Sequence, residues 1–436
     1  MSVKAKSGSL SHIGASRVGE YAAHEMPPLP NGVRVLFDPL PYVHSVCASV
    51  WIGAGSVNED AQEAGITHFL EHLFFKGTST RSARKLMEEI EGRGGHLNAF
   101  TSRDSMCLYV RVLEEHTSIG LEILADILKD SQFFDFEKER NVVMEEIVSV
   151  EDVPEDYCHD LLLMHLWPDH PLGRPVTGFL ETVAQISPEM AHAYYRRWCR
   201  PENIIVSVAG NFSEVETYDQ ISEYFGTLGA APLPPRPRAP LSQQGLAVID
   251  RDIGQSHLCL AFPAPAAGDS HRYVAEMAAS VLGGGSTSRL FDRIREQEGL
   301  AYSIYSFRSS YQIAGSLGIY AAVSPENLQK AVALIAEEIS KLRENPVPED
   351  EMELNREQIR GGILLAMEST SNRASHMARS VFYHGRILSP DEIVAEVQSV
   401  SSESLLRFAQ DVFVQERCAA VVLGPQEGTA GLNLGL

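Results

Sequence analysis

The chain has 436 residues, of which 44% are hydrophobic, 22% charged and 8% aromatic, a composition typical of a soluble globular protein rather than a disordered or fibrous one. This length predicts two or three domains, and we start from two. The net charge of -22 argues against a nucleic-acid partner, because phosphate contacts need clustered Lys and Arg. No apolar run approaches the roughly 20 residues that a membrane span requires.

The N-terminus and the cysteines bear on the cellular compartment. Residues 1–25 lack the apolar stretch of a secretory signal, so we interpret them as a tail. The 6 cysteines form no C-x-x-C pair, which indicates reduced thiols and a cytoplasmic protein. An organelle matrix is the alternative, because the first 19 residues are Ser-rich and lack acids.

Hydrophobic patterning predicts the elements of the first half of the chain. The expected strands cover residues 33–38, 45–52, 105–113 and 203–209. They alternate with expected helices at about 63–76, 82–91, 114–129 and 136–150.

A proline-rich segment divides the chain into two parts of similar length. PLPPRPRAP, residues 232–240, breaks helices and strands. We therefore expect a tail over 1–25, a metal-binding domain over 26–229, a linker over 230–242 and a second domain over 243–436.

The two parts share an internal repeat. Residues 105–128 read as a strand that runs into an amphipathic helix, and residues 315–339 repeat that order. Strand-helix-strand repeats are few, which favours mixed or antiparallel sheets over a doubly wound sheet. The predicted fold is α+β, with two homologous domains that each pack helices on one face of a mixed or antiparallel sheet.

The segment GITHFLEHLFFKG, residues 65–77, carries the chemistry. It reads as a buried helix in which His68 and His72 project from one face, with Glu71 beside them. Burying these groups without partners would be costly, which favours a role as metal ligands. Zinc suits imidazole nitrogen and carboxylate oxygen. The alternative is a helix whose histidines are merely hydrogen-bonded.

A catalytic zinc needs a third protein ligand and an open position. Candidates lie in FEKERNVVMEEIVSVEDVPED. Helical geometry places Glu139 and Glu146 on the same face and rotates Glu145 by about 100° from Glu146. Geometry narrows this choice without settling it.

These motifs resemble the pitrilysin/insulinase family of zinc peptidases, the inverzincins, whose H-x-x-E-H reverses the thermolysin-type order. The likeness covers nearly the whole chain. It is closest to short members such as the catalytic subunit of the mitochondrial processing peptidase and its bacterial relatives. The supporting segments are NAFTS (98–102), ERNVVMEEI (139–147), HPLGRPVTG (170–178), YRRWCRPENIIVSVAGN (195–211) and LGGGSTSRLFDRIREQEGLAYSIYSF (282–307).

The resemblance assigns roles around the metal. It implies that His68, His72 and Glu146 bind one zinc ion per chain. Glu71 resembles the general base, which takes a proton from water and delivers it to the leaving amine. Glu139 resembles the acid that orients a ligand histidine.

The resemblance also assigns residues that contact substrate. Arg295 and Tyr302 match a pair that holds the scissile carbonyl and its developing oxyanion; without the family they read as a surface ion-pair residue and a strand aromatic. The strand at Asn98, Ala99 and Phe100 matches an edge to which an extended peptide adds. Its alternative is an ordinary strand beside the site.

Two further acids bear on specificity. Asp156 and Asp160 fall where the processing peptidase places acids that receive a substrate arginine. With the acidic charge balance, this implies a preference for basic peptides. The alternative is a solvated acidic helix.

The family encloses substrate in a chamber built from two two-domain units, and this chain supplies one unit. The resemblance therefore implies a zinc endopeptidase that hydrolyses unfolded peptides, as a homodimer or as a heterodimer with an inactive homologue. Two alternatives belong to other classes: a non-catalytic structural subunit of a larger complex, and a zinc amidohydrolase that acts on a non-peptide substrate.

Overall fold

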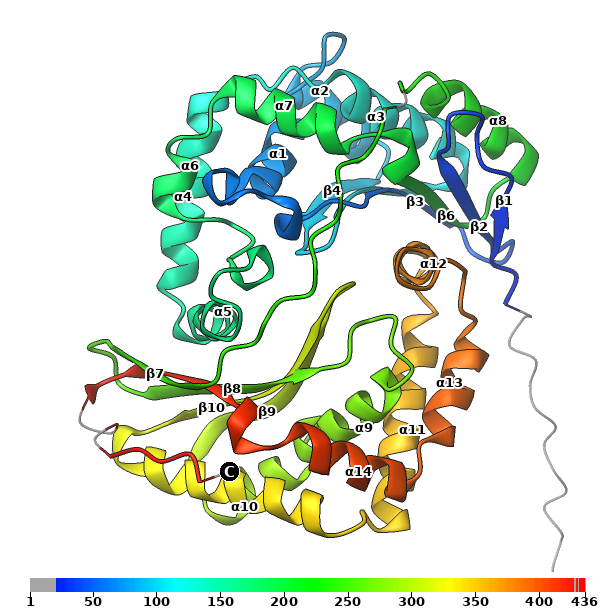
Figure 1. Cartoon of the computed structure of the whole chain (residues 1–436). Helices are drawn as coiled ribbons and strands as arrows, with labels where there is room; N and C mark the ends of the chain where they lie inside the picture. The colour runs from blue at the N-terminus through cyan, green and yellow to red at the C-terminus, as the bar shows by residue number, and fades with distance from the viewer. Residues whose placement is uncertain (1–20, 230, 427–428, 430, 436) are drawn as a thin grey trace, which may run out of the picture.

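The computed structural model describes residues 21–229, 231–426, 429 and 431–435. Over these residues the chain forms two β-sheets that face each other, each with a layer of helices on its outer side (Figure 1). Residues 1–20 of the predicted tail lie outside the described residues. The first strand begins at His24, inside the range predicted as tail, because His24 pairs with Phe37.

The first sheet has six strands within the described residues, in the order β1-β2-β6-β3-β5-β4. β2 and β6 are parallel, and the other neighbours are antiparallel. The strands are β1 (His24–Met26), β2 (Arg34–Pro39), β3 (Ser45–Ile52), β4 (His96–Thr101), β5 (Met106–Leu113) and β6 (Ile204–Gly210).

The second sheet repeats this topology. Its order over the described residues is β7-β11-β8-β10-β9, with β7 and β11 parallel and the rest antiparallel. The edge strand β9 is thus the counterpart of β4. Two mixed sheets built on one plan confirm the predicted fold class. The strands are β7 (Gly245–Asp250), β8 (Ser256–Ala264), β9 (Ala301–Ser310), β10 (Gly315–Val323) and β11 (Ala419–Gly424).

The helices of the first half include the four that patterning predicts, with ends shifted by a few residues. The metal-motif helix is shorter than predicted, because Gly65 stands before its first turn. The helices are α1 (Ile66–Phe74), α2 (Ala83–Glu91), α3 (Thr117–Asp130), α4 (Phe136–Glu151), α5 (Pro154–Leu166), α6 (Leu180–Val183), α7 (Pro188–Trp198) and α8 (Glu214–Phe225).

The connection between the halves has no helix or strand over its described residues 231–244. In the second half one α-helix lies between β8 and β9, and the other described α-helices lie between β10 and β11. In chain order, these helices are α9 (Arg272–Gly283), α10 (Leu328–Glu344), α11 (Glu349–Ala366), α12 (Thr370–His384), α13 (Pro390–Ser399) and α14 (Ser402–Val412).

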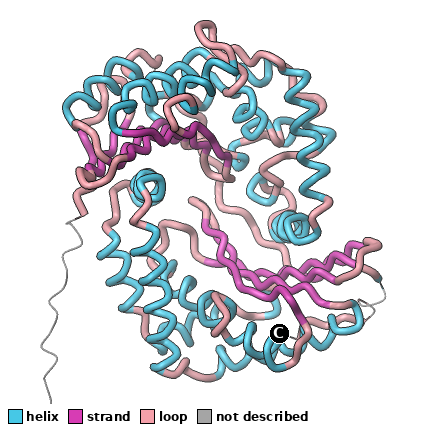
Figure 2. The backbone as a smooth tube through the Cα atoms, turned by 180° about the vertical axis from the view of Figure 1, so that it is seen from behind, coloured by secondary structure: helices cyan, strands magenta, loops and turns pink. Residues whose placement is uncertain are grey.

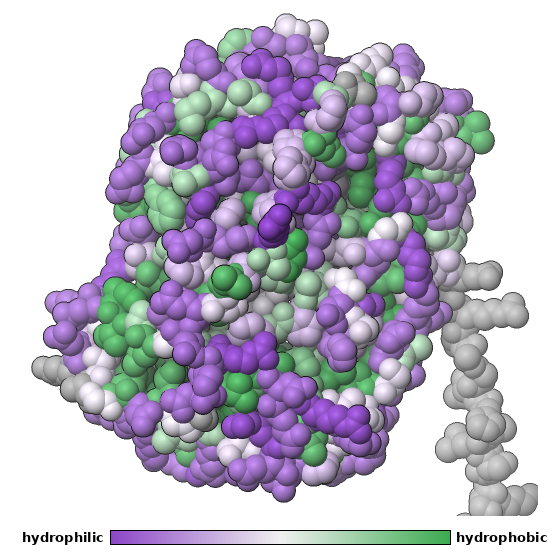
Figure 3. Space-filling view, viewed as in Figure 1, coloured by the Kyte–Doolittle hydropathy of each residue, from purple (hydrophilic) through white to green (hydrophobic). Residues whose placement is uncertain are grey.

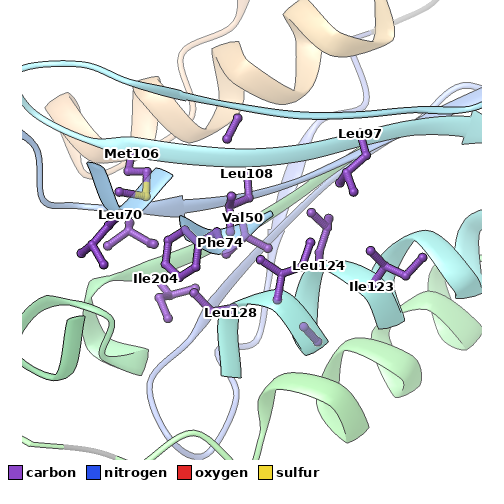
Figure 4. Packing of buried hydrophobic residues seen from close by; sticks show 14 of the residues in the cluster. Val50, Leu70, Phe74, Leu97, Met106, Leu108, Ile123, Leu124, Leu128 and Ile204 are labelled. Atoms are coloured by element: carbon purple, nitrogen blue, oxygen red, sulfur yellow. The ribbon is translucent and has the colours of Figure 1, made fainter. Parts of the chain in front are cut away.

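The core of the first half lies between the sheet and its outer helix layer. Successive strand residues point to opposite faces, so alternate positions such as Val50 and Leu108 meet α1 and α3. Leu70 and Phe74 of α1 pack beside them (Figure 4). The apolar face of α1 is therefore buried, and its position beside β4 is fixed by packing.

The opposite face of each sheet is also buried, by a helix from the other half. α12 packs on β2, β3 and β6 of the first sheet, and α5 packs on β8 and β11 of the second. Both helices lie between the two sheets, as the views from front and back agree (Figures 1 and 2). We predicted helices on one face of each sheet; each sheet in fact carries, on its other face, one helix from the other half. We call α5 and α12 the exchanged helices.

Polar contacts hold α12 in place. The guanidinium of Arg373 donates to the carboxylate of Asp38 on β2 at 2.5 and 3.1 Å, and both side chains are buried. The hydroxyl of Ser207 on β6 donates to the carbonyl of Ala374 at 2.8 Å. Because a buried charge is costly unless paired, this ion pair orients α12 over the first sheet.

The outer surface is largely polar. On the face shown in Figure 3 hydrophilic residues predominate, and hydrophobic residues gather mainly at lower left, where Figure 1 shows β7. Among the described helices, none combines the length and apolar character needed to cross a membrane.

Candidate metal centre and active site

The start of α1 is held by a buried carboxylate. Gly65, at the N-cap, has no side chain to accept the free N–H groups of the first turn. Glu59 takes that role: its two carboxylate oxygens accept from the backbone N–H groups of Gly65 and Thr67, both at 2.8 Å. Glu59 is 2% exposed, and burial raises its pKa to about 8. These bonds fix the helix one residue before His68.

Gly65 itself is required by conformation and by space. Its φ is +94°, in the left-handed region that L side chains rarely adopt. A Cβ at this position would lie 2.5 Å from the carbonyl oxygen of Thr177. The chain therefore turns tightly against residues 177–178 as it enters the helix.

Three side chains from two helices converge next to this start. Nε2 of His68 lies 3.5 Å from Oε1 of Glu146, and Nε2 of His72 lies 3.3 Å from Oε2 of the same carboxylate. One ligand atom from each of the three falls within 4.8 Å of the others, an arrangement that could hold a metal ion. We call His68, His72 and Glu146 the metal group. Two imidazole nitrogens and one carboxylate oxygen are a donor set that suits zinc. The neighbouring Glu145 is exposed.

The electrostatics of His68 and Glu146 favour metal binding. Burial lowers the pKa of His68 to about 4, which keeps its imidazole neutral. The hydrogen bond with His72 lowers the pKa of Glu146, which keeps it ionised. Neutral imidazole and ionised carboxylate are the ligating forms. Nδ1 of His68 is buried without a hydrogen-bond partner among the described residues.

A second carboxylate stands behind His72. Oε2 of Glu139 lies 3.6 Å from Nδ1 of His72, the ring nitrogen that faces away from Glu146. Oε1 of Glu139 pairs with the ammonium of Lys76 at 2.9 Å. Glu139 is buried, so this lysine offsets the cost of its charge. The arrangement suits orientation of the histidine.

Glu71 lies between the metal group and the edge strand. Its Oε2 accepts a hydrogen bond from the hydroxyl of Thr101, the last residue of β4, at 2.6 Å. Burial raises the pKa of Glu71, and the Thr101 bond opposes that shift. A carboxylate with a raised pKa beside a metal group is suited to accept a proton.

The predicted peptide-binding residues lie on β4, which is an edge of the first sheet. Asn98 and Phe100 are exposed on the face that looks toward α12, whereas Ala99 is buried on the α1 side. Phe100 packs edge-on against Trp51 with ring centroids 5.4 Å apart. An edge with exposed alternate side chains is open to a further strand.

The predicted acidic pair sits on α5, and one of its members is already paired. Asp160 accepts from the guanidinium of Arg103 at 3.0 Å. Asp156 is exposed. Arg103 follows β4 by two residues, so both acids lie beyond the Thr101 end of the edge strand.

Arg295 and Tyr302 contact each other in the second half. The guanidinium of Arg295 donates to the carbonyl of Tyr302 at 2.5 Å and lies 4.7 Å from its ring centroid. Tyr302 is 80% exposed. Among the described residues, no hydrogen bond or ion pair joins either side chain to the metal group.

The chain matches one protein family along most of its length. Residues 34–178 match the model described as insulinase (peptidase family M16), and residues 185–359 match that of the peptidase M16 inactive domain. A Bacillus subtilis relative named uncharacterized zinc protease YmxG is 37% identical over 90% of this chain and 96% of its own length. This chain belongs to peptidase family M16. The predicted family is thereby confirmed.

A second relative and a solved structure are also similar to this chain over most of its length. An uncharacterized zinc protease of Mycobacterium leprae is 36% identical over 91% of each chain. The crystal structure of a protease from Helicobacter pylori superposes with a TM-score of 0.87, covering 92% of this chain and 99% of that one at 22% identity. At that identity the structural likeness concerns the fold. The match to the inactive domain begins in the last part of the first half, at residue 185, and ends at residue 359, and no H-x-x-E-H string lies within it.

Sequence reasoning missed Glu59, Thr101 and Arg103. Each of these residues forms a hydrogen bond with a residue that is distant in the sequence or lies across a turn. Hydrophobic patterning does not predict such partners. One signal was present: Glu59 is an acid in a segment that enters an apolar helix through a glycine without a capping side chain.

We expect Glu59→Gln to loosen the start of α1. Above pH 8, where the Glu59 carboxylate is ionised, the amide places an N–H group against one of two backbone N–H donors, which lowers the free energy of unfolding by about 1–3 kcal/mol. Urea unfolding of the metal-free protein measures this, with Glu137→Gln as the exposed control, for which a change within about 0.5 kcal/mol is expected. Equal stability of Glu59→Gln and wild type would contradict the capping role.

Proposed function

We propose that this protein is a zinc-dependent endopeptidase that hydrolyses unfolded peptides. One observation carries the proposal: His68, His72 and Glu146 converge on one point, next to Glu71 and to the open edge of β4. A metal group, a proton acceptor and a strand edge are the parts that peptide hydrolysis needs. M16 membership and the zinc protease names of relatives support it.

The residues of the chain divide the work. His68, His72 and Glu146 would hold the zinc ion, which when bound would polarise the scissile carbonyl and make the attacking water more acidic. Glu71 takes the proton of that water and delivers it to the leaving amine nitrogen. The Thr101 hydroxyl keeps the Glu71 carboxylate in place through its 2.6 Å bond. Glu139 steadies the ring of His72.

If Glu71 transfers the proton, replacing it should sharply reduce turnover and leave zinc binding intact. Glu71→Gln is expected to retain about one zinc per chain while kcat falls by roughly 10²-fold or more, because the amide cannot accept the proton. His72→Ala is expected to lose both zinc and activity. Metal content by atomic emission, with hydrolysis of an unstructured peptide with and without chelator, measures these outcomes. A zinc-loaded Glu71→Gln protein with full activity would refute the mechanism.

We further propose that the working enzyme is a homodimer in which Arg295 and Tyr302 serve the metal site of the partner. Two observations support this. Tyr302 points to solvent, with 80% of it exposed, and the described contacts of the pair do not reach the metal group of its own chain. Two such units would enclose the peptide, and a chamber admits unfolded chains more readily than folded proteins.

Complementation between inactive chains tests this arrangement. Glu71→Gln chains are co-assembled with chains that carry both Arg295→Ala and Tyr302→Phe. In a mixed dimer the intact Glu71 of one chain meets the intact pair of the other, so about a quarter of wild-type activity returns at equal mixing. A monomeric native mass, or no activity in isolated mixed dimers, would contradict the proposal.

We also propose a preference for basic residues at the α5 end of the site. Asp156 is exposed there, and Asp160 would exchange its bond with Arg103 for one with a substrate cation. A peptide with Arg on the N-terminal side of the cleaved bond should exceed its Glu counterpart in kcat/KM, most at low salt, because salt screens exposed charges. Equal rates for the two peptides at low salt would rule this out.

A further inference from the structure

A polar pocket of about 380 Å³ adjoins the edge strand on the sheet face opposite α1. Its walls come from both halves of the chain. β3, β4 and β5 of the first sheet supply one wall, and the first two turns of the exchanged helix α12 supply the other. The lining includes His96, Phe100, Tyr109, Arg111, Ser371 and Asn372.

This pocket is lined by a basic side chain, although the protein as a whole is strongly acidic. The chain carries 58 acidic residues against 36 Lys and Arg. The described residues that line the pocket nevertheless include Arg111 and no Asp or Glu. Across the described part of the chain, no ion pair or hydrogen bond is formed by the Arg111 side chain. Its guanidinium therefore offers unused donors beside the hydroxyl and amide groups of Tyr109 and Asn372.

Strand register fixes the distance from this pocket to the reacting groups. Arg111 pairs across the sheet with His96 at the start of β4, and Thr101, which binds Glu71, is the last residue of β4. Thr101 follows His96 by five positions along β4, a span of roughly 17 Å. A peptide paired with β4 would thus reach Arg111 about four to six residues from the cleaved bond.

The two ends of the edge strand carry different groups, and antiparallel pairing sets the direction of a bound peptide. Beyond the Thr101 end lie the exposed Asp156 and the Asp160–Arg103 pair, whereas Arg111 and His96, unpaired among the described residues, flank the other end. β4 and β5 pair in antiparallel fashion, and a peptide that continues this pattern runs from the Thr101 end toward His96. Residues on the C-terminal side of the cleaved bond then face Arg111.

We propose that Arg111 and His96 form an anion subsite that binds a substrate carboxylate about four to six residues after the cleaved bond. The carboxylate is that of an Asp or Glu side chain or of the peptide C-terminus. This inference rests on the proposed peptidase function and adds a substrate class to it: peptides with an acidic group after the cleavage site.

Binding to an inactive enzyme tests the subsite without turnover. Zinc-loaded Glu71→Gln is titrated with labelled unstructured peptides that carry Glu or Gln at successive positions after the cleaved bond, and fluorescence anisotropy gives Kd. At low salt the Glu peptide should bind about five- to tenfold more tightly at one of these positions. Adding Arg111→Ala should bring that ratio close to one, and Arg111→Lys should keep part of it.

A charge reversal with a matched control sharpens the test. Arg111→Glu should invert the preference in favour of a Lys peptide, whereas Arg84→Glu, on the exposed surface of α2, changes the net charge equally and should leave the ratio unchanged. The inference is overturned if Arg111→Glu leaves the ratio unchanged, if Arg84→Glu shifts it equally, or if only acids before the cleaved bond bind more tightly.

Cleavage by the wild type separates this inference from the proposed function. If the wild type cleaves the Gln peptide with no preference for Glu, the subsite is rejected and the peptidase function stands. If no peptide is cleaved or bound, the proposed function fails, and the subsite fails with it.

Discussion

Each sheet of this protein has two apolar faces, and the helix layer of its own half covers one of them. Alternation along the strands produces this constraint: Leu260 and Phe262 face the outer helices, while Cys259 and Ala261 face inward. The exchange of α5 and α12 satisfies it. The same exchange places Asp156 and Asp160 at one end of the β4 edge and the polar turn of α12 near the other, so the groups that we propose to face substrate are positioned by a packing requirement.

Local patterning predicted the parts of this structure that depend on short-range sequence. The spacing of His68 and His72 placed both side chains on one face of α1, where they meet Glu146, and the duplicated strand-helix segments indicated two sheets of one topology. Apolar periodicity located the first-half elements because their packing faces repeat along the chain. The resemblance to the M16 family then supplied Glu146, which spacing alone left open against Glu139 and Glu145.

The missed features depend on contacts between distant segments. Glu59 lies on a loop whose role becomes visible once its carboxylate reaches the backbone at Gly65 and Thr67. Arg103 neutralises Asp160 across a gap of 57 residues, which no local pattern encodes. α12 reads as an ordinary amphipathic helix, and its Arg373 finds Asp38 335 residues earlier. The sequence therefore indicated the candidate metal ligands more readily than the residues that hold their helices in place.

The exchanged helices α5 and α12 hold the two halves of the chain together. Residues 231–244 form an extended connection, yet the halves are also joined by the buried Asp38–Arg373 pair and by apolar contacts of α5 and α12. Separating the halves would expose one apolar face of each sheet to water. It would also split the buried Asp38–Arg373 ion pair and leave each charge without its partner. A chain nicked by protease in this connection would thus stay assembled, and neither half expressed alone would keep the surface it needs to fold.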